Sequence, residues 1–246
     1  MKNYRLKIQY DGTRFQGWQR QKNGVDTIQG RIEQVLTRQM GHPVEIDGAG
    51  RTDAGVHAAE QVANVRLSYE GTPEQLQECL NEYLPEDIRI LKVELAGERF
   101  HSRLNATGKI YEYRLCKQGC SDVFLRKYQW QMKEELFVER MRAAALLMLG
   151  EHDFRGFCTK ASRKKSTVRR IDAIEIREDA CHLFLRFEGN GFLYNMVRIL
   201  TGTLVEIGTG RRDLSSIEQI FLKKDRTLAG ATAPAKGLTL LKVKYD

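Results

Sequence analysis

The order of strand-like and helix-like segments constrains this chain most, because one order occurs in both halves. In the first half, alternating apolar residues predict a strand over residues 4–10. After Thr27, a helix cap, apolar residues recur with the helical period at Ile28, Ile32 and Leu36. A short strand follows at residues 43–46 and another strand at 63–67. The half ends with a helix over residues 72–84, which opens on the capping box "TPEQ", and a strand over 88–95.

The second half repeats the β-α-β-β-α-β order loosely. We expect a strand over residues 109–115 and a helix over 137–149 that is stopped by Gly150. Two strands follow at 168–176 and 181–187, then two helices at 192–207 and 217–223, and a closing strand at 238–245. The prediction is an α+β protein of two ferredoxin-like halves, 1–105 and 106–246, with mainly antiparallel sheets and helices on the outer faces. Residues 100–109 lack a Pro/Gly-rich linker, so we expect the halves to pack around an active-site cleft.

The charge of the chain favours a polyanionic partner. Its 246 residues carry a net charge of +8 with a pI near 9.2. Near the N-terminus, Arg14, Arg20 and Lys22 interleave with Phe15 and Trp18. Cations that pair with phosphates beside aromatics that stack on bases suit looped RNA, although a solvated loop and a partly buried Trp would look the same. A second basic cluster lies in "KASRKKSTVRR" and comprises Lys160, Arg163, Lys164, Lys165, Arg169 and Arg170.

Several classes of protein are disfavoured. The N-terminus has no apolar signal segment, and the longest apolar run, residues 143–149, is far too short to span a membrane. Five cysteines, an odd number, indicate free thiols and a cytoplasmic location. Cys116 and Cys120 could form half of a metal site, but no second pair follows. Walker A, dinucleotide-binding, G-x-S-x-G and H-E-x-x-H motifs are missing.

The segment "GAGRTDAGVHA", residues 48–58, is the strongest candidate for chemistry. Its three glycines predict a tight loop that lets a bulky group approach the backbone, and the alternative is a surface turn with an incidental Arg–Asp pair. A carboxylate, Asp53, beside an arginine, Arg51, suits attack on a nucleobase or a glycosidic carbon. His57 follows Asp53 by four residues, a spacing insufficient for a dyad, and we expect it to make a structural hydrogen bond.

These motifs together resemble one family over nearly the whole chain. "GRTDAGVHA" is similar to the catalytic signature of the TruA-type tRNA pseudouridine synthases. The family's other motifs have counterparts in the same order: "YDGTRFQGWQRQ", "TIQGRIE", "RFHSRLNATGKIYEY", "GEHDF", "GNGFLYNMVR" and "TAPAKGLTLLKVKY". Ser102, where alanine is expected, and Val65, where an aromatic is frequent, depart from the pattern at positions that concern only RNA contacts.

The resemblance implies an isomerase that detaches uracil from a uridine, rotates the base and rejoins it through carbon 5. It implies uridines 38 to 40 of the tRNA anticodon stem-loop as targets, no metal or organic cofactor, and a homodimer across which one tRNA lies. Asp53 would be the nucleophile and Arg51 would fill the space of the flipped base. Arg198 would keep the aspartate ionised, Tyr111 would stack on the uracil, and Leu238 would line its pocket.

The residue assignments have alternatives. The alternative for Arg51 is a plain phosphate contact, and the alternative for Tyr111 and Leu238 is a position in the core. Two rival functions also remain: a non-catalytic RNA-binding protein, and a hydrolase of a glycosidic bond. Such a hydrolase usually pairs two carboxylates, and the neighbours of Asp53 in sequence are Glu45 and Asp47.

Overall fold

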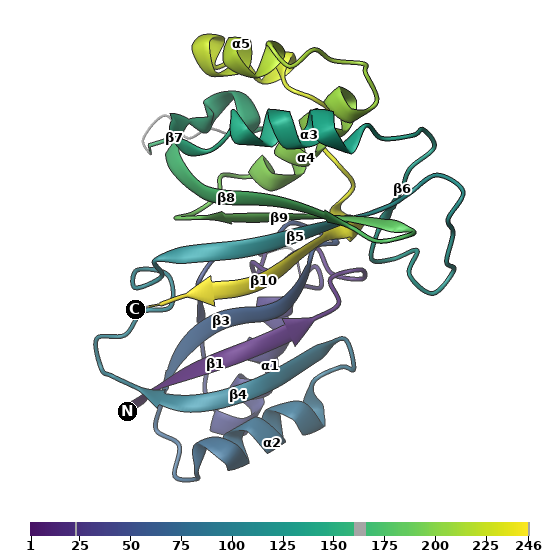
Figure 1. The fold of residues 1–246 in the computed structure, drawn as a ribbon. Coiled ribbons are helices and arrows are strands. Elements are labelled where there is room, and N and C mark those ends of the chain that lie inside the picture. Colours follow the sequence, from purple (N-terminus) through teal and green to yellow (C-terminus); the bar gives the residue numbers. More distant parts are fainter. Residues whose placement is uncertain (23, 160–165, 246) are drawn as a thin grey trace. The chain divides into compact units, whose positions relative to one another are not determined.

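A computed structural model describes residues 1–22, 24–159 and 166–245 (Figure 1). The chain divides into two compact units. The first comprises Met1–Thr107 and the chain from Thr239 onward, and the second comprises Gly108–Leu238. The sequence places the boundary at 105/106 and the closing strand in the second half. In the structure, the residues from Thr239 onward group with the first unit, because β10 (Leu238–Lys244) pairs with β3 (His57–Leu67) of that unit at Thr239 and Leu240.

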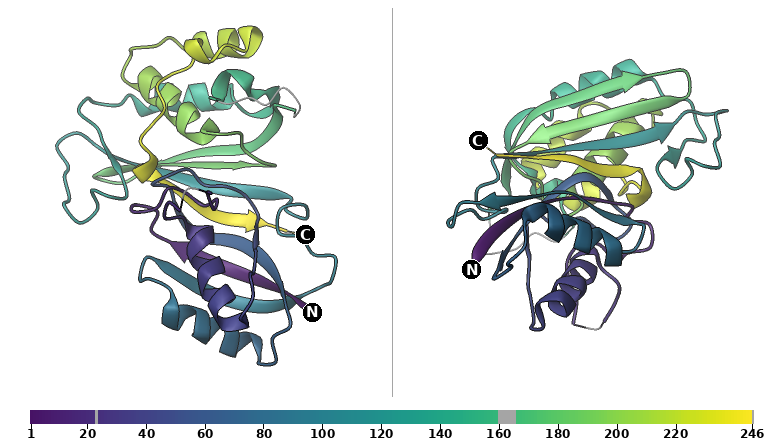
Figure 2. Two further views of the ribbon diagram at one scale, coloured as in Figure 1. Left: turned by 180° about the vertical axis from the view of Figure 1, so that it is seen from behind. Right: turned by 90° about the horizontal axis from the view of Figure 1, so that it is seen from below.

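The first unit has the β-α-β-β-α-β order. Its elements are β1 (Lys2–Tyr10), α1 (Ile28–Met40), β2 (Asp47–Gly48), β3 (His57–Leu67), α2 (Pro73–Tyr83) and β4 (Ile88–Ala96). β1 is antiparallel to both β3 and β4, β2 is antiparallel to β3, and β10 is parallel to β3. Helices α1 and α2 lie on one face of this sheet (Figure 2). Alternating residues of β1 are buried and share one face of the strand, and they are Tyr4, Leu6, Ile8 and Tyr10.

Both helices of this unit start where their caps predict. The Thr27 hydroxyl accepts the Gly30 amide at 3.2 Å. In the capping box of α2, the Thr72 hydroxyl accepts the Gln75 amide at 3.3 Å and the Gln75 side chain accepts the Thr72 amide at 2.8 Å. Leu76 and Leu80 of α2 are fully buried. The helix expected after Thr27 and the helix expected over residues 72–84 are therefore confirmed, as Ile28–Met40 and Pro73–Tyr83.

The second unit is built on an antiparallel sheet with strand order β5-β9-β8-β7. The strands are β5 (Gly108–Cys116), β7 (Gly150–Asp153), β8 (Val168–Glu178) and β9 (His182–Gly189), and β6 (Trp130–Gln131) lies parallel to β5. Helices α3 (Val138–Leu146) and α4 (Met196–Gly208) pack together over this sheet (Figure 1). α5 (Ser216–Lys223) packs on the short helix η1 (Phe154–Phe157), and η2 (Arg226–Leu228) and η3 (Ala235–Gly237) precede β10. The α+β class with mainly antiparallel strands is confirmed.

Three expected elements differ from the structure. Residues 43–46 form no strand, because side chains of α1 take their backbone amides: Thr37 accepts from Val44 and Glu33 from Ile46, both at 3.0 Å. Helix α3 ends at Leu146, and the chain continues through residues 147–149 in tighter i→i−3 hydrogen bonds. Helix α4 begins only at Met196, because Asn195 has the left-handed conformation with φ 60°.

The five cysteines are all free, as expected. No helix within the described ranges is long and apolar enough to cross a membrane. In the same ranges, no three His, Cys, Asp or Glu side chains are arranged so that they could hold a metal ion.

The packing of α4 against the segment that follows η2 predicts a large stability effect at one glycine. A Cβ atom on Gly202 would lie 1.7 Å from the Ala231 carbonyl oxygen, and backbone atoms cannot yield as a side chain would. We expect Gly202→Ala to lower the free energy of unfolding by about 1–3 kcal/mol, measured by denaturant unfolding. At Gly97 a Cβ atom would meet nothing within 4 Å, so Gly97→Ala is the control and should leave stability unchanged. Equal stability of both variants would contradict this packing.

Candidate functional site in the Asp53 loop

The loop that carries the candidate nucleophile connects β2 to β3 over residues 49–56. Asp53 is half-buried and Arg51 is exposed, whereas Thr52 between them is only 7% exposed. The Val56 amide donates to the Asp53 carbonyl oxygen at 3.1 Å, which closes a tight turn through Gly55 with φ +76°. The loop therefore presents Arg51 to solvent and keeps Asp53 partly shielded.

The segment of residues 12–19, from the motif "YDGTRFQGWQRQ", holds this loop in place. The Trp18 amide donates to the Thr52 carbonyl oxygen at 3.1 Å, and the Gly55 amide donates to the Phe15 carbonyl oxygen at 3.3 Å. The side chains of Trp18 and Phe15 are 2% and 3% exposed. These two aromatics are core residues of the first unit, so the expectation that they stack on RNA bases is wrong for this structure.

Gly48 has a packing role that the sequence does not reveal. A Cβ atom at this position would lie 2.5 Å from Nε1 of the Trp18 indole. The space that the glycine leaves is therefore occupied by Trp18, and Gly48 does not offer it to a nucleotide.

Beneath the loop, three buried polar side chains are hydrogen-bonded together. The hydroxyl groups of Tyr10 and Thr52 lie 2.8 Å apart, and Nε2 of Gln61 donates to the Gly50 carbonyl oxygen at 3.0 Å and to the Tyr10 hydroxyl at 3.5 Å. Burial raises the pKa of Tyr10 to about 12, against the opposing effect of hydrogen bonds to Thr52 and Gln61. Tyr10 therefore remains a neutral phenol at physiological pH.

Arg51 is held at one edge of the loop by a chain of amides. Its Nε donates to Oε1 of Gln19 at 2.9 Å, and Nε2 of Gln19 donates to Oε1 of Gln29 at 2.6 Å. Gln29 in turn donates to Oε1 of Glu33 at 2.8 Å. Sequence reasoning missed Gln19 and Gln29, although both lie in the motifs "GWQRQ" and "TIQGRIE" that precede the loop.

His57 makes the structural hydrogen bond that the sequence predicts. Its Nδ1 accepts the Gly12 amide at 3.1 Å, and the side chain is 5% exposed. The Asp11 carboxylate lies equally close to Nδ1, at 3.1 Å. One ring nitrogen carries either a lone pair or a proton, and the Gly12 amide can only donate. The Gly12 amide therefore requires a lone pair on Nδ1, whereas the Asp11 carboxylate requires a proton there.

The remaining candidates for the reaction belong to the second unit. Arg198 lies on the first turn of α4, where Nε donates to the Ala233 carbonyl oxygen at 2.7 Å and one terminal nitrogen donates to Oδ1 of Asn195 at 3.0 Å. The Ala233 amide donates back to the Arg198 carbonyl oxygen at 3.1 Å. The left-handed Asn195 thus both starts the helix and orients the guanidinium group.

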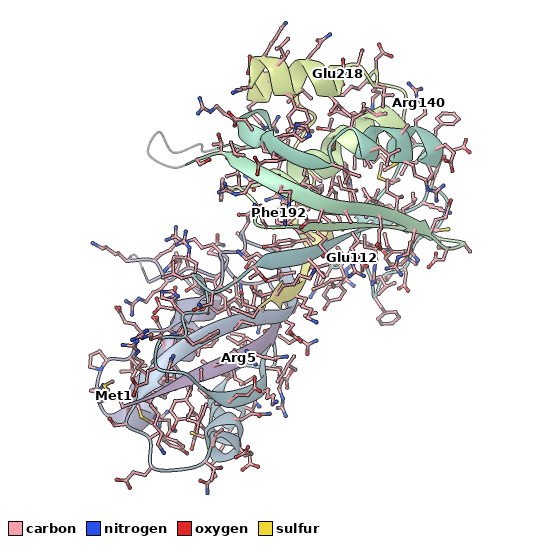
Figure 3. The ribbon with its side chains drawn as sticks, turned by 60° about the vertical axis from the view of Figure 1, so that its left-hand side comes forward. Met1, Arg5, Glu112, Arg140, Phe192 and Glu218 are labelled. Atoms are coloured by element: carbon pink, nitrogen blue, oxygen red, sulfur yellow. The ribbon has the colours of Figure 1, made fainter. Side chains whose placement is uncertain are left out.

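Tyr111 and Leu238 are both buried, with 8% and 5% of their surface exposed. Tyr111 lies on β5 opposite Phe187 and packs edge-on against Phe192, with ring centroids 5.3 Å apart (Figure 3 labels Phe192). Leu238 follows Gly237, where a Cβ atom would lie 2.6 Å from the Tyr113 ring. The Tyr113 hydroxyl donates to the Pro234 carbonyl oxygen at 2.7 Å. Tyr113, another residue that sequence reasoning missed, thereby anchors the segment before Leu238.

The candidate RNA-binding cations differ in their surroundings. Arg14 is exposed and forms an ion pair with Asp87. Arg170 is exposed and pairs with Asp172 at 2.7 Å, whereas Arg169 is half-buried and its pKa is lowered by burial. Arg169 and Arg170 are neighbours on β8, so their side chains point to opposite faces of the sheet. The other cluster members lie outside the described residues: Lys160, Arg163, Lys164 and Lys165.

Comparison with known proteins identifies the class of this chain. The family model for tRNA pseudouridine synthases matches residues 7–105 and 144–246, which include Asp53, Arg198 and Leu238. Tyr111 lies between the two matched segments. The chain belongs to the tRNA pseudouridine synthase family, and it is an isomerase that forms pseudouridine in tRNA.

The full-length relatives carry a more specific name. The chain is 46% identical over 245 residues to tRNA pseudouridine synthase A of Bacillus sp. (strain KSM-64), with all of both chains covered. It is 44% identical to tRNA pseudouridine synthase A 2 of Bacillus cereus (strain ZK / E33L) and 39% identical to tRNA pseudouridine synthase A of Thermoanaerobacter sp. (strain X514), again over the full length of both chains. Among solved structures, a chain of a Cbf5-Nop10-Gar1 complex aligns with 97% of this chain and 58% of its own, at 10% identity and a TM-score of 0.40, values too low to support a comparison.

Proposed function

We propose that this protein converts uridine to pseudouridine at positions 38 to 40 of the tRNA anticodon stem-loop, with Asp53 as the nucleophile. The observation that carries the proposal is the Asp53 loop itself. Asp53 is half-buried in a turn whose backbone is fixed from the segment of residues 12–19 and from the buried side chains below, and a fixed carboxylate suits covalent attack. The motifs that surround the loop resemble those of synthases specific for this stem-loop.

The reaction requires that the target base leave the RNA stack, at a cost of a few kcal/mol. Asp53 forms a bond to the flipped nucleoside, at the base or at C1′ of the ribose, and the glycosidic N1–C1′ bond breaks. The uracil rotates, carbon 5 bonds to C1′ and the bond to Asp53 breaks. The proton of carbon 5 is removed with the help of Tyr111, and N1 gains a proton. Arg51 fills the vacated space. Its exposed guanidinium group, held by Gln19 at 2.9 Å, is available at the loop surface for that role.

The other roles follow the resemblance. Arg198 keeps Asp53 ionised, Tyr111 stacks on the uracil and Leu238 forms an apolar wall of its pocket. The orientation of Arg198 by Ala233 and Asn195 supports a positioned charge, because a guanidinium group with two fixed hydrogen bonds loses little freedom on binding. The proposal includes a homodimer that binds one tRNA across both subunits, in the cytoplasm, where tRNA is processed.

An assay of the reaction product tests this function against its rivals. The protein is incubated with an unmodified tRNA transcript, and the nucleosides and free bases are separated by chromatography with mass detection. We expect isomerised uridine of unchanged mass. Unchanged RNA would indicate a binding protein, and free uracil would indicate a hydrolase. Against the hydrolase, Glu45 is exposed and paired with Arg20, and Asp47 is exposed, so neither is a shielded second acid.

Electrostatic binding of the tRNA gives a further prediction. Each phosphate that a lysine neutralises releases counterions. A plot of the logarithm of the affinity against the logarithm of the salt concentration therefore has a negative slope, whose magnitude is about 0.7–0.9 per contact. We expect Lys164→Ala together with Lys165→Ala to flatten that slope by about 1.4–1.8, measured by filter binding between low and physiological salt. Lys223→Ala, on the exposed end of α5, is the control. A slope equal to that of the unaltered protein would show that the two lysines do not contact RNA.

A further inference from the structure

Three buried polar side chains connect the Asp53 loop to the two strands beneath it. Tyr10 is the last residue of β1, Gln61 lies within β3, and Thr52 is the residue before Asp53. Their exposed fractions are 3%, 0% and 7%, respectively. Buried polar groups of this kind are costly unless each is hydrogen-bonded, so their arrangement is tightly specified.

The directions of these hydrogen bonds follow from the chemistry of the groups. Oε1 of Gln61 accepts the Val62 amide at 3.1 Å, which leaves the NH₂ group of the same side chain facing the Gly50 carbonyl oxygen and the Tyr10 hydroxyl. Tyr10 therefore accepts from Gln61, and its hydroxyl forms a second hydrogen bond with Oγ1 of Thr52, 2.8 Å away, in which either oxygen can donate. These hydrogen bonds form a continuous relay from Gln61 through Tyr10 to Thr52.

The relay contacts the catalytic loop on both sides of Arg51. Gln61 holds the carbonyl oxygen of Gly50, and Tyr10 holds the side chain of Thr52. The Thr52 carbonyl oxygen is held from the opposite side by the Trp18 amide at 3.1 Å. Residues 50 and 52 are thus fixed by groups that do not contact RNA in the proposed mechanism. Because residue 52 is bonded to Asp53, the position of residue 52 determines the position of the Asp53 backbone.

We propose that Tyr10, Gln61 and Thr52 are positioning residues of the reaction, which set the Asp53 carboxylate at the distance and angle that attack on the nucleoside requires. This inference rests on the proposed role of Asp53. Its physical basis is that catalysis by a positioned nucleophile is sensitive to displacements of about 1 Å, which cost up to about a hundredfold in rate. Binding of tRNA through phosphates and stacking is much less sensitive to such displacements.

The same strand offers a matched control. Tyr4 also lies on β1, on the same face as Tyr10, and is fully buried, yet its hydroxyl has no hydrogen-bond partner within the described part of the chain. Tyr4→Phe and Tyr10→Phe remove the same atom from the same layer of the core. Only the second breaks a contact with the Asp53 loop.

The test compares single-turnover rates at saturating tRNA transcript, tRNA dissociation constants and melting temperatures. We expect Tyr10→Phe and Thr52→Val to lower the rate at least about tenfold while the dissociation constant changes by less than about twofold. Tyr4→Phe should react at the unaltered rate. Thr52→Ser retains the hydroxyl and should recover most of the rate that Thr52→Val loses, which a role in packing alone would not produce.

The outcomes separate this inference from the proposed function. Rates within about twofold of the unaltered protein for both Tyr10→Phe and Thr52→Val would overturn the inference. If Tyr10→Phe does not fold, the comparison of Thr52→Val with Thr52→Ser decides, because Thr52 lies at the loop. Asp53→Asn is measured in the same series. Turnover by that variant would refute the role of Asp53, whereas an inactive Asp53→Asn beside fully active relay variants would refute the relay alone.

Discussion

Asp53→Asn should lose pseudouridine formation by at least about 10⁴-fold while it keeps its affinity for tRNA. Asparagine has nearly the volume of aspartate, and the backbone hydrogen bond from Val56 to residue 53 does not depend on the side chain. The loop should therefore keep its shape. A neutral amide is a poor nucleophile, however, and cannot form the covalent bond that the mechanism requires. The measurement is the rate of pseudouridine formation with a tRNA transcript, alongside binding in the absence of turnover.

Asp47→Asn is the matched control for this variant. Asp47 starts β2, six residues before Asp53, and its side chain is 65% exposed. Its replacement removes an equal charge next to the same loop, so a general electrostatic effect would appear in both variants. We expect Asp47→Asn to keep its turnover. Weakened tRNA binding with a proportionate loss of activity in Asp53→Asn would mean that Asp53 only shapes the loop.

Arg198→Met should reduce turnover at neutral pH by at least about tenfold without unfolding the second unit. The substitution removes the charge that we propose keeps Asp53 ionised, and it also removes the hydrogen bonds to Ala233 and Asn195. Arg198→Lys distinguishes these two effects, because lysine keeps the charge but cannot reproduce the planar pair of bonds. We expect its rate to lie between those of Arg198→Met and the unaltered protein.

The control for the Arg198 variants is a measurement of their melting temperatures, which shows whether they are folded. Helix α4 is buried over most of its length, so a variant that disturbs its first turn would lower the melting temperature of the second unit. Circular dichroism melts of Arg198→Met and Arg198→Lys should agree within a few degrees of the unaltered protein. Normal turnover of a folded Arg198→Met would remove this arginine from the catalytic machinery.

The sequence predicts the local structure best where a side chain acts on its own backbone. Thr27 and the capping box at Thr72 define the helix starts, and the alternation in residues 4–10 defines β1. Prediction from the sequence fails where a side chain that is distant in sequence accepts the backbone hydrogen bonds that a strand would need. Residues 43–46 have the composition of a strand, but Glu33 and Thr37 take their amides, and no local pattern shows this.

The sequence predicts the candidate site in part, as it does the local structure. Asp53 and Arg51 stand out in the sequence because their glycine-rich loop is unusual and resembles a family signature. Gln61 and Tyr10 do not stand out in the sequence, because each occupies an ordinary position in a strand pattern. Their proposed positioning role depends on the pairing of β1 with β3, which brings residues 51 positions apart into hydrogen-bond contact. Glu60 and Asn64 are polar residues of the same stretch of β3, so the sequence does not single out Gln61.

Mapping of pseudouridine in cellular tRNA tests the central proposal most directly. The tRNA of a strain that lacks this gene is compared with that of the same strain complemented by the unaltered chain or by Asp53→Asn. Pseudouridine at positions 38 to 40 of the anticodon stem-loop should disappear on deletion, return with the unaltered chain and stay absent with Asp53→Asn. Unchanged modification at these positions in the deletion strain, or its return with Asp53→Asn, would contradict the account.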